Sequence, residues 1–179
     1  MPTPKVKTRR LLLPPHLIQS ALDGRLTEHR VPVEPQFTIT DSGLWMGNGK
    51  AIIRHVGGTR FAKPRVYTDA ELLRGCAEHF CPTPVGTLLW VAERWQKVCG
   101  TFEEYAIYGD GSYRSYTPQT GYVSALQRCG EFSHARLKPA SHMPQWASRL
   151  WFEVTAVRIE REGDKWEWVY TLNRVEAER

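Results

Sequence analysis

The sequence predicts an α+β protein that is mainly β, built as a small closed or nearly closed barrel with short flanking helices. Three observations support this fold class. Short strand-type segments recur along the 179 residues, only two modest helical segments stand among them, and strands and helices do not alternate in a βαβ rhythm. The length suits a single domain. We expect residues 1–10 to form a flexible basic tail and residues 11–179 to form that domain.

The two predicted helices lie in the first half of the chain. Prolines precede His16–Leu22 and a glycine follows it, while its apolar residues fall on one helical face. Thr68 and Glu71 have the spacing of a capping box, in which each side chain bonds the backbone N–H of the other. This box opens an amphipathic helix, which ends before Pro82 because proline interrupts a helix. Both segments are predicted as short flanking helices.

The clearest strand signal is at the C-terminal end. There Trp166, Trp168 and Tyr170 alternate with other residues in a period of two. We expect this segment to form a hairpin with Arg149–Glu160. The remaining predictions are glycine-rich hairpins over Phe37–Ile53, an extended segment over Arg25–Val33, a buried strand over Leu88–Val98, a strand over Tyr105–Tyr108, and a segment typical of a long loop over Tyr113–Glu131.

Charge and hydropathy narrow the function classes only slightly. The chain has 24 Lys and Arg residues against 19 Asp and Glu residues, a net charge of +5, which is a mild bias toward polyanions. The apolar run Leu88–Ala92 is five residues long, far short of a membrane span. The basic N-terminus lacks the apolar core of a signal peptide. We therefore expect a cytoplasmic protein, in the host cytoplasm if the gene is viral, with no membrane partner.

The four cysteines are expected to be thiols in that compartment. Their spacing is irregular and contains no Cys-x-x-Cys, so buried structural thiols are favoured over a zinc site built on Cys76, His79 and Cys81. No Walker-type phosphate loop, zinc-protease helix or dinucleotide-binding glycine motif is present. We predict neither a metal nor a cofactor.

The most distinctive segment is the polar stretch that leads into the strand predicted from Arg149. It contains two prolines, Pro139 and Pro144, which fix the local backbone and disfavour a central strand. His142, Trp146 and Arg149 should therefore lie on a rigid, partly exposed loop. Loops of this composition are common where proteins contact ligands.

Four segments together resemble the ASCH proteins of phages and prophages, relatives of the PUA-like RNA-binding barrels. Leu17–Arg30 resembles the family's first helix and the Gly-Arg-Lys-Thr-x-Thr motif that follows it. Cys81–Glu93 is similar to its Cys-Pro…Leu-Trp-Val-x-Glu block. Lys138–Arg161 contains its His-Met-Pro-Gln-Trp-Ala-Ser-Arg signature, and Trp166–Glu176 resembles its closing strand. The resemblance covers about half the chain and implies a PUA-like, ASCH-type barrel.

The same resemblance implies two candidate activities, and the chain lacks residues that one of them requires. Some ASCH proteins hydrolyse N-acylated cytidine with a lysine, a threonine and a glutamate, and others are reported as ribonucleases. Leu26 stands where the lysine would be and His29 where the threonine nucleophile would be. Since leucine carries neither charge nor proton, the family's hydrolase chemistry is not transferred. Glu93 keeps the acidic position of its block.

Candidate catalytic residues are Thr27, His29, Glu93 and His142. Histidine titrates near neutral pH and can act as a general base, and a threonine hydroxyl needs such a base to become nucleophilic. The competing interpretation is that Thr27 and His29 lie on a solvated strand edge, and that His142 caps a local turn.

Candidate nucleic-acid contacts form the main hypothesis. Arginine suits phosphate because its planar group donates hydrogen bonds in pairs, which nominates Arg25, Arg30 and Arg149, together with Lys138. Trp146 or Tyr113 is expected to stack on a base, although Trp146 also suits a plug at one end of the barrel.

The predicted function is binding of RNA, another single-stranded nucleic acid or a modified nucleotide. One alternative is a hydrolase that acts on RNA or on N-acylated pyrimidine nucleosides. A second alternative is a phage protein that binds a host protein. The sequence leaves all three open.

Overall fold

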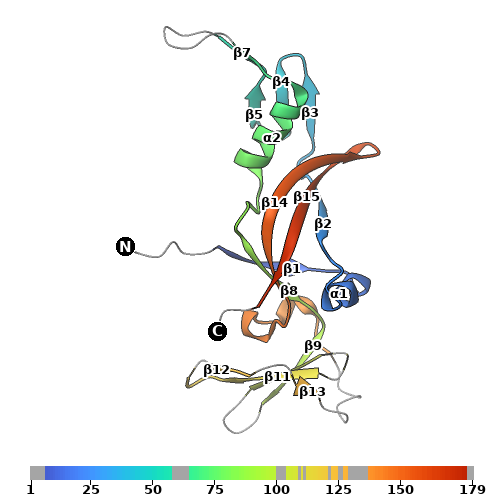
Figure 1. Ribbon diagram of the computed structural model, residues 1–179, viewed down its shortest axis with the longest axis vertical. Coiled ribbons are helices and arrows are strands. Elements are labelled where there is room, and N and C mark those ends of the chain that lie inside the picture. Colours follow the sequence, from blue (N-terminus) through green and yellow to red (C-terminus); the bar gives the residue numbers. More distant parts are fainter. Residues whose placement is uncertain are drawn as a thin grey trace. The chain divides into compact units, whose positions relative to one another are not determined.

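The chain folds into two compact units in the computed structural model, which describes residues 7–57, 65–99, 104–108, 110, 112–120, 122–124, 127–128 and 137–176. The first unit contains residues 1–26, 87–153 and 174–179, and the second contains residues 27–86 and 154–173. The described part is mainly β with two α-helices, as predicted. Two long strands, β14 (Trp151–Glu162) and β15 (Lys165–Val175), run side by side and contribute to both units (Figure 1). Residues 11–179, predicted as one domain, are described below unit by unit.

The first unit begins with β1 (Thr8–Leu12), which pairs in parallel with β8 (Leu88–Ala92). The start of β14 pairs antiparallel with the other edge of β8. Thr8, Arg9 and Arg10, expected in the tail, are thus in a strand because β8 supplies their hydrogen-bonding partners, while residues 1–6 lie outside the described residues. Helix α1 (Pro15–Leu22) follows Pro14 and confirms the first helix prediction.

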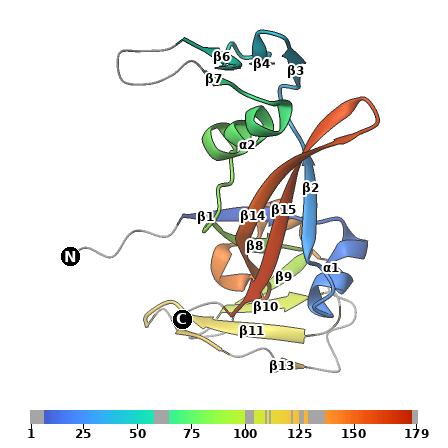
Figure 2. The ribbon, with the colours of Figure 1, turned by 45° about the horizontal axis from the view of Figure 1, so that its top comes forward.

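A second sheet of the first unit carries the candidate site. Its strand order is β12-β11-β10-β9, and β13 also pairs with β11; β10 and β11 lie side by side in Figure 2. The segment predicted as one strand over Leu88–Val98 is in fact two strands, β8 and β9, which belong to different sheets. The chain turns between them at Glu93, and Arg149 binds the carboxylate of Glu93. The bounds are β9 (Trp95–Cys99), β10 (Glu104–Tyr108), β11 (Ser112–Thr117), β12 (Tyr122–Val123) and β13 (Gln127–Arg128).

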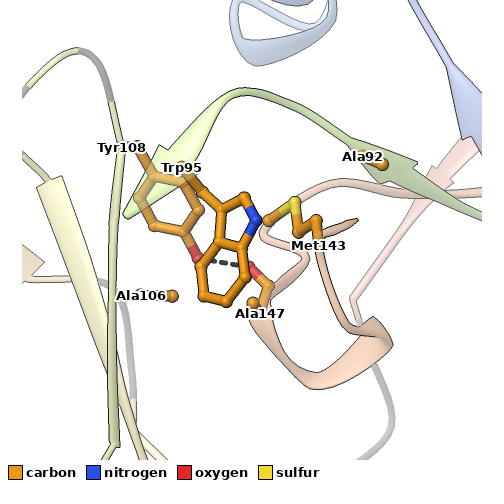
Figure 3. Close-up of a cluster of buried hydrophobic side chains, with 6 residues drawn as sticks. All are labelled: Ala92, Trp95, Ala106, Tyr108, Met143 and Ala147. Atoms are coloured by element: carbon orange, nitrogen blue, oxygen red, sulfur yellow. Dashed lines mark hydrogen bonds between the residues drawn. The ribbon is translucent and has the colours of Figure 1, made fainter. Parts of the chain in front are cut away.

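A loop with two short 3-10 helices, η1 (Ala140–His142) and η2 (Gln145–Ala147), covers this sheet's core. Pro139 and Pro144 stand immediately before the two turns, as their fixed backbone angle favours. The core cluster beneath the loop joins side chains from β8, β9, β10 and the loop itself (Figure 3). Its buried members are Ala92, Trp95, Ala106, Tyr108, Met143 and Ala147.

The second unit contains the glycine-rich hairpins that the sequence predicts over Phe37–Ile53. Strands β3, β4 and β5 form an antiparallel meander, and α2 packs against β4 and β5. The predicted capping box of α2 is confirmed: the backbone N–H groups of Thr68 and Glu71 each donate to the other side chain, at 2.9 and 3.3 Å. The bounds are β3 (Phe37–Thr40), β4 (Gly43–Met46), β5 (Ala51–Ile53), β6 (His55–Val56), β7 (Arg65–Val66) and α2 (Asp69–Phe80).

The hairpin of β14 and β15 is also confirmed. It turns at Gly163, whose φ of 58° favours glycine. On the other side of β15 lies β2 (Glu28–Pro32), antiparallel to it. Trp168, Tyr170 and Leu172 of β15 are all at most 5% exposed, as the period-two pattern predicts, but Val169 on the other face is fully buried as well.

The predicted closed barrel is not formed by the described strands, which make open sheets. The sheet built on β14 and β15 ends at β1 and at β2, and neither pairs with a further described strand. Strand β2 has the features of a protected edge: it alternates charged residues with half-buried ones and ends in Pro32, which has no N–H to donate. The barrel prediction is therefore wrong for these residues, because a strand of this kind does not continue a sheet. No helix of the described part is long and apolar enough to cross a membrane.

Candidate functional site

An open groove of about 650 Å³ lies in the first unit. Strand β9 supplies Trp95 and Lys97, which share one face because side chains two positions apart in a strand point the same way. The loop supplies the other walls. The lining residues are Trp95, Lys97, Lys138, His142, Pro144 and Trp146. Below we call this the Trp146 groove.

Trp146 is the centre of an aromatic arrangement. Its ring stacks on that of Tyr116, with centroids 4.9 Å apart and planes inclined by 18°. The ring of Trp95 meets it edge-on at 6.4 Å and 87°. Trp146 is half-buried and packs against the core cluster, yet it also lines the groove. The two interpretations offered by the sequence, a core plug and a stacking surface, therefore describe two sides of one residue.

The loop that carries Trp146 is held by hydrogen bonds to residues of three strands, β10, β11 and β8. Tyr108 donates its hydroxyl hydrogen to the carbonyl oxygen of Ala147 (Figure 3). Arg114 donates to the carbonyl oxygen of Ser148 at 2.9 Å, and the Ser148 hydroxyl lies 2.9 Å from the carbonyl oxygen of Val91. Because these contacts fix the loop before any ligand arrives, little conformational entropy is lost on binding.

Two side chains of the groove, those of Lys138 and His142, have no hydrogen-bond or ion-pair partner among the described residues. Lys138 is anchored through its backbone, which exchanges hydrogen bonds with Trp95 at 2.6 and 3.3 Å, while its ammonium group contacts no acceptor among the described residues. His142, at the end of η1, is exposed, and within the same part of the chain its ring has no hydrogen-bond partner either. Lys138, predicted as a nucleic-acid contact, and His142, predicted as a catalytic residue, thus both line the groove.

Arg149, also predicted as a phosphate contact, is not among the residues that line the Trp146 groove. Its guanidinium is 3% exposed and donates to both carboxylate oxygens of Glu93, each at 2.7 Å. It donates further to Asp110 at 2.5 Å and to Ser112 at 2.7 Å, and it stands 4.4 Å above the ring of Tyr108. Four of its five N–H donors are therefore satisfied inside the protein. This Arg149 cluster fixes the end of the loop, and it occupies Glu93, a predicted catalytic residue.

The pH dependence of stability should reveal this cluster. Burial raises the pKa of the Asp110 carboxyl, but hydrogen bonds from Ser112 and Arg149 lower it more, to about 2. An unfolded aspartate has a pKa of about 3.9, so this stabilisation is complete above about pH 4 and is lost as pH falls toward 2. We expect the free energy of unfolding of the wild type to fall more steeply than that of Asp110→Asn over this range, in urea titrations. Parallel pH profiles would contradict the assignment.

The other predicted phosphate contacts are engaged by carboxylates. Arg25, in the first unit, lies 2.6 Å from Asp23. Arg30, in the second unit, lies 2.6 Å from Glu160 and 3.7 Å from Glu167. These pairs are solvent-exposed, and exposed pairs contribute little to stability. Neither arginine belongs to the residues that line the Trp146 groove.

Tyr113, the alternative stacking residue, packs against a neighbour in its own sheet. Its ring lies 6.2 Å from that of Tyr105. Tyr116, three positions further along β11, is the tyrosine that stacks on Trp146.

The predicted catalytic residues divide between the units. Thr27 and His29 belong to the second unit, where Thr27 is exposed and His29 is half-buried in β2. Burial lowers the pKa of His29, which favours the neutral imidazole at pH 7. Glu93 and His142 belong to the first unit. Leu26, at the position of the family's lysine, is 8% exposed and belongs to the apolar core.

The cysteines of the alternative zinc site behave as structural thiols. Burial raises the pKa of Cys76 to about 11, which disfavours the thiolate that binds metal. The Cys81 sulfur contacts the backbone of Thr83 and lies 3.8 Å from the Tyr170 hydroxyl. Over the residues that the structure describes, no three His, Cys, Asp or Glu side chains are grouped to hold a metal ion.

The net positive charge of the chain comes entirely from the unit that holds the groove. The sequence of the first unit has 14 Lys and Arg residues against 9 Asp and Glu residues, a net charge of +5, whereas the second unit has 10 of each. The sequence alone did not show this division because the units interleave along the chain. Trp95, Lys97 and Tyr116 were missed as well; the two-residue spacing of Trp95 and Lys97 on one strand was a signal that could have found them.

Comparison with known proteins found no match to this chain in any family model, any curated protein or any solved structure.

Proposed function

We propose that the first unit binds single-stranded nucleic acid, RNA in particular, in the Trp146 groove. The observation that carries the proposal is the joint placement around one groove of a half-buried, pre-stacked tryptophan and of Lys138 and His142, whose side chains have no partner among the described residues. Aromatic rings that stack bases, combined with a positive channel that follows the backbone, are the common elements of single-strand recognition.

Trp146 acts as the stacking platform. A nucleobase placed on the side that faces the groove extends the existing pair of Tyr116 and Trp146 into a three-ring stack. Base–aromatic stacking contributes about 1–3 kcal/mol per base and tolerates any base, because every base has a π-face. We therefore expect the groove to bind single-stranded nucleic acid with only a weak preference for sequence.

Lys138 and His142 act on the phosphate. Both lie on the loop that carries Trp146, and Lys97 of β9 lines the same groove. The net charge of +5 in this unit adds a sequence-independent attraction for polyanions. The resemblance of the chain to phage-type ASCH proteins, with their PUA-like relatives that bind RNA, supports the same proposal.

A salt titration with single-stranded RNA and DNA of about ten nucleotides tests the proposal. Two or three neutralised phosphates predict that the logarithm of the association constant falls with the logarithm of salt concentration with a slope of about −1.4 to −2.1. The RNA should remain intact. Cleavage would favour the hydrolase alternative, whose candidate residues are Thr27, His29, Glu93 and His142. Absence of binding at low salt would overturn the proposal in favour of a protein partner.

A further inference from the structure

Arg10 brings a further cation to the loop beside the groove. It projects from β1 and donates a hydrogen bond to the carbonyl oxygen of Ser141 at 2.6 Å. Its guanidinium lies 5.9 Å from the centre of the Trp90 ring, and Trp90 packs against the core cluster. These two contacts hold the arginine against Ser141, the residue that precedes His142 in the chain. His142 lines the groove.

Arg10 keeps most of its binding capacity for a ligand. A guanidinium has five N–H donors, and in the described part of the chain only one of them is used, by Ser141. The acceptor is a neutral carbonyl, and no described carboxylate pairs with Arg10, unlike Arg25, Arg30 and Arg149. The positive charge of Arg10 is therefore left uncompensated.

Lys138, His142 and the point where Arg10 contacts the loop all lie within one short stretch, residues 138–142. Lys138 and His142 line the groove, and Arg10 reaches the loop from β1 at Ser141. A single nucleotide stacked on Trp146 has one 5′ phosphate, which Lys138 and His142 suffice to contact. A guanidinium held further along the loop suits the phosphate of a neighbouring nucleotide, since its fork donates in pairs to phosphate oxygens.

We propose that the ligand of the Trp146 groove is an oligonucleotide rather than a mononucleotide, and that its backbone passes along Lys138–His142 to a second phosphate site at Arg10. This inference rests on the proposed function and adds the length of the ligand and the direction in which it leaves the groove. It predicts that affinity rises when a second nucleotide is added, and that Arg10 contributes only to the longer ligand.

The test measures the affinities of adenosine 5′-monophosphate and of an oligoadenylate of about eight nucleotides by calorimetry. Arg10→Ala should weaken oligoadenylate binding by up to about fivefold and lower the salt slope by about 0.7, while binding of the monophosphate stays unchanged. Arg74→Ala is the matched control, because Arg74 is an exposed arginine of α2 in the second unit with no partner in the described residues. This control substitution should leave the affinity for both ligands unchanged.

The monophosphate separates a phosphate contact from a structural role. If Arg10 only supported the loop through Ser141, Arg10→Ala would weaken the binding of both ligands by the same factor. That result would overturn the inference. Equal affinity of the wild type for monophosphate and oligoadenylate would also overturn it while leaving the proposed function intact. If the wild type bound neither ligand, the proposed function itself would fail. Arg10→Lys, which keeps the charge but loses the fork, should bind oligoadenylate with intermediate affinity.

Discussion

Replacing Trp146 with alanine is expected to weaken the binding of single-stranded RNA by between about fivefold and about 150-fold. This range corresponds to the loss of about 1–3 kcal/mol of base stacking. Tyr116 stacks on Trp146, but it is not among the residues that line the groove. Fluorescence anisotropy of a labelled RNA at fixed salt measures the loss. The salt slope should remain unchanged, since the substitution removes no charge.

Trp45→Ala is the control for this substitution. Trp45 is 42% exposed on β4 in the second unit, so it is a surface tryptophan outside the groove. Trp146→Phe keeps an aromatic face and should retain most of the affinity. If Trp45→Ala and Trp146→Ala weaken binding equally, or if neither does, the groove is not where bases stack. Loss of binding on Trp146→Phe as well would indicate that the indole shape, rather than stacking alone, is required.

Local structure was predictable from the sequence because its causes lie within a few residues of each other. The capping box of α2 depends on Thr68 and Glu71, which are one turn apart, and both of its hydrogen bonds form. The strand β15 was predictable from the period-two spacing of Trp166, Trp168 and Tyr170. The loop of His142 and Trp146 was recognised from its own prolines, and the structure places both residues at the groove.

The contacts that assemble the groove were not predictable in the same way, because they join distant residues. Trp95 pairs its backbone with Lys138, and Tyr116, which the sequence predicts in a long loop, lies in β11 and stacks on Trp146. The sequence predicts Arg10 in a flexible tail, because its neighbours in the chain do not show that this segment pairs with β8, some 80 residues away. The barrel failed for a related reason: strand patterns predict that strands exist, but closure depends on how their edges meet.

Arg149 shows how a correct local signal can mislead about a role. The sequence identified an arginine in a ligand-type loop, and arginines in such loops often bind phosphate. Its actual partner, Glu93, is 56 residues away, and their pairing was not visible in the spacing. A phosphate that reached Arg149 would have to displace a two-point carboxylate contact that is 5% exposed or less on both sides. We therefore expect Arg149 to support the loop through the Arg149 cluster.

Replacing Arg149 with methionine should lower the free energy of unfolding by about 3–5 kcal/mol, because Glu93 would remain as a buried carboxylate without a partner. The comparison is Arg25→Ala, which breaks an exposed pair with Asp23 and should cost at most about 1 kcal/mol. Urea titrations followed by tryptophan fluorescence measure both. Equal costs for the two substitutions would show that the burial of the Glu93–Arg149 pair has no energetic consequence.

The double substitution Glu93→Leu with Arg149→Met distinguishes support from ligand contact. Replacing both members of a buried ion pair by apolar groups is often nearly neutral, so the double variant should recover most of the stability lost by Arg149→Met alone. If Arg149 only supports the loop, the recovered variant should also bind RNA with an affinity close to that of the wild type and with the same salt slope. If Arg149 instead contacts phosphate, the stable double variant would still bind weakly, with a slope smaller in magnitude by about 0.7. The outcome decides between the role indicated by the structure and the role predicted from the sequence.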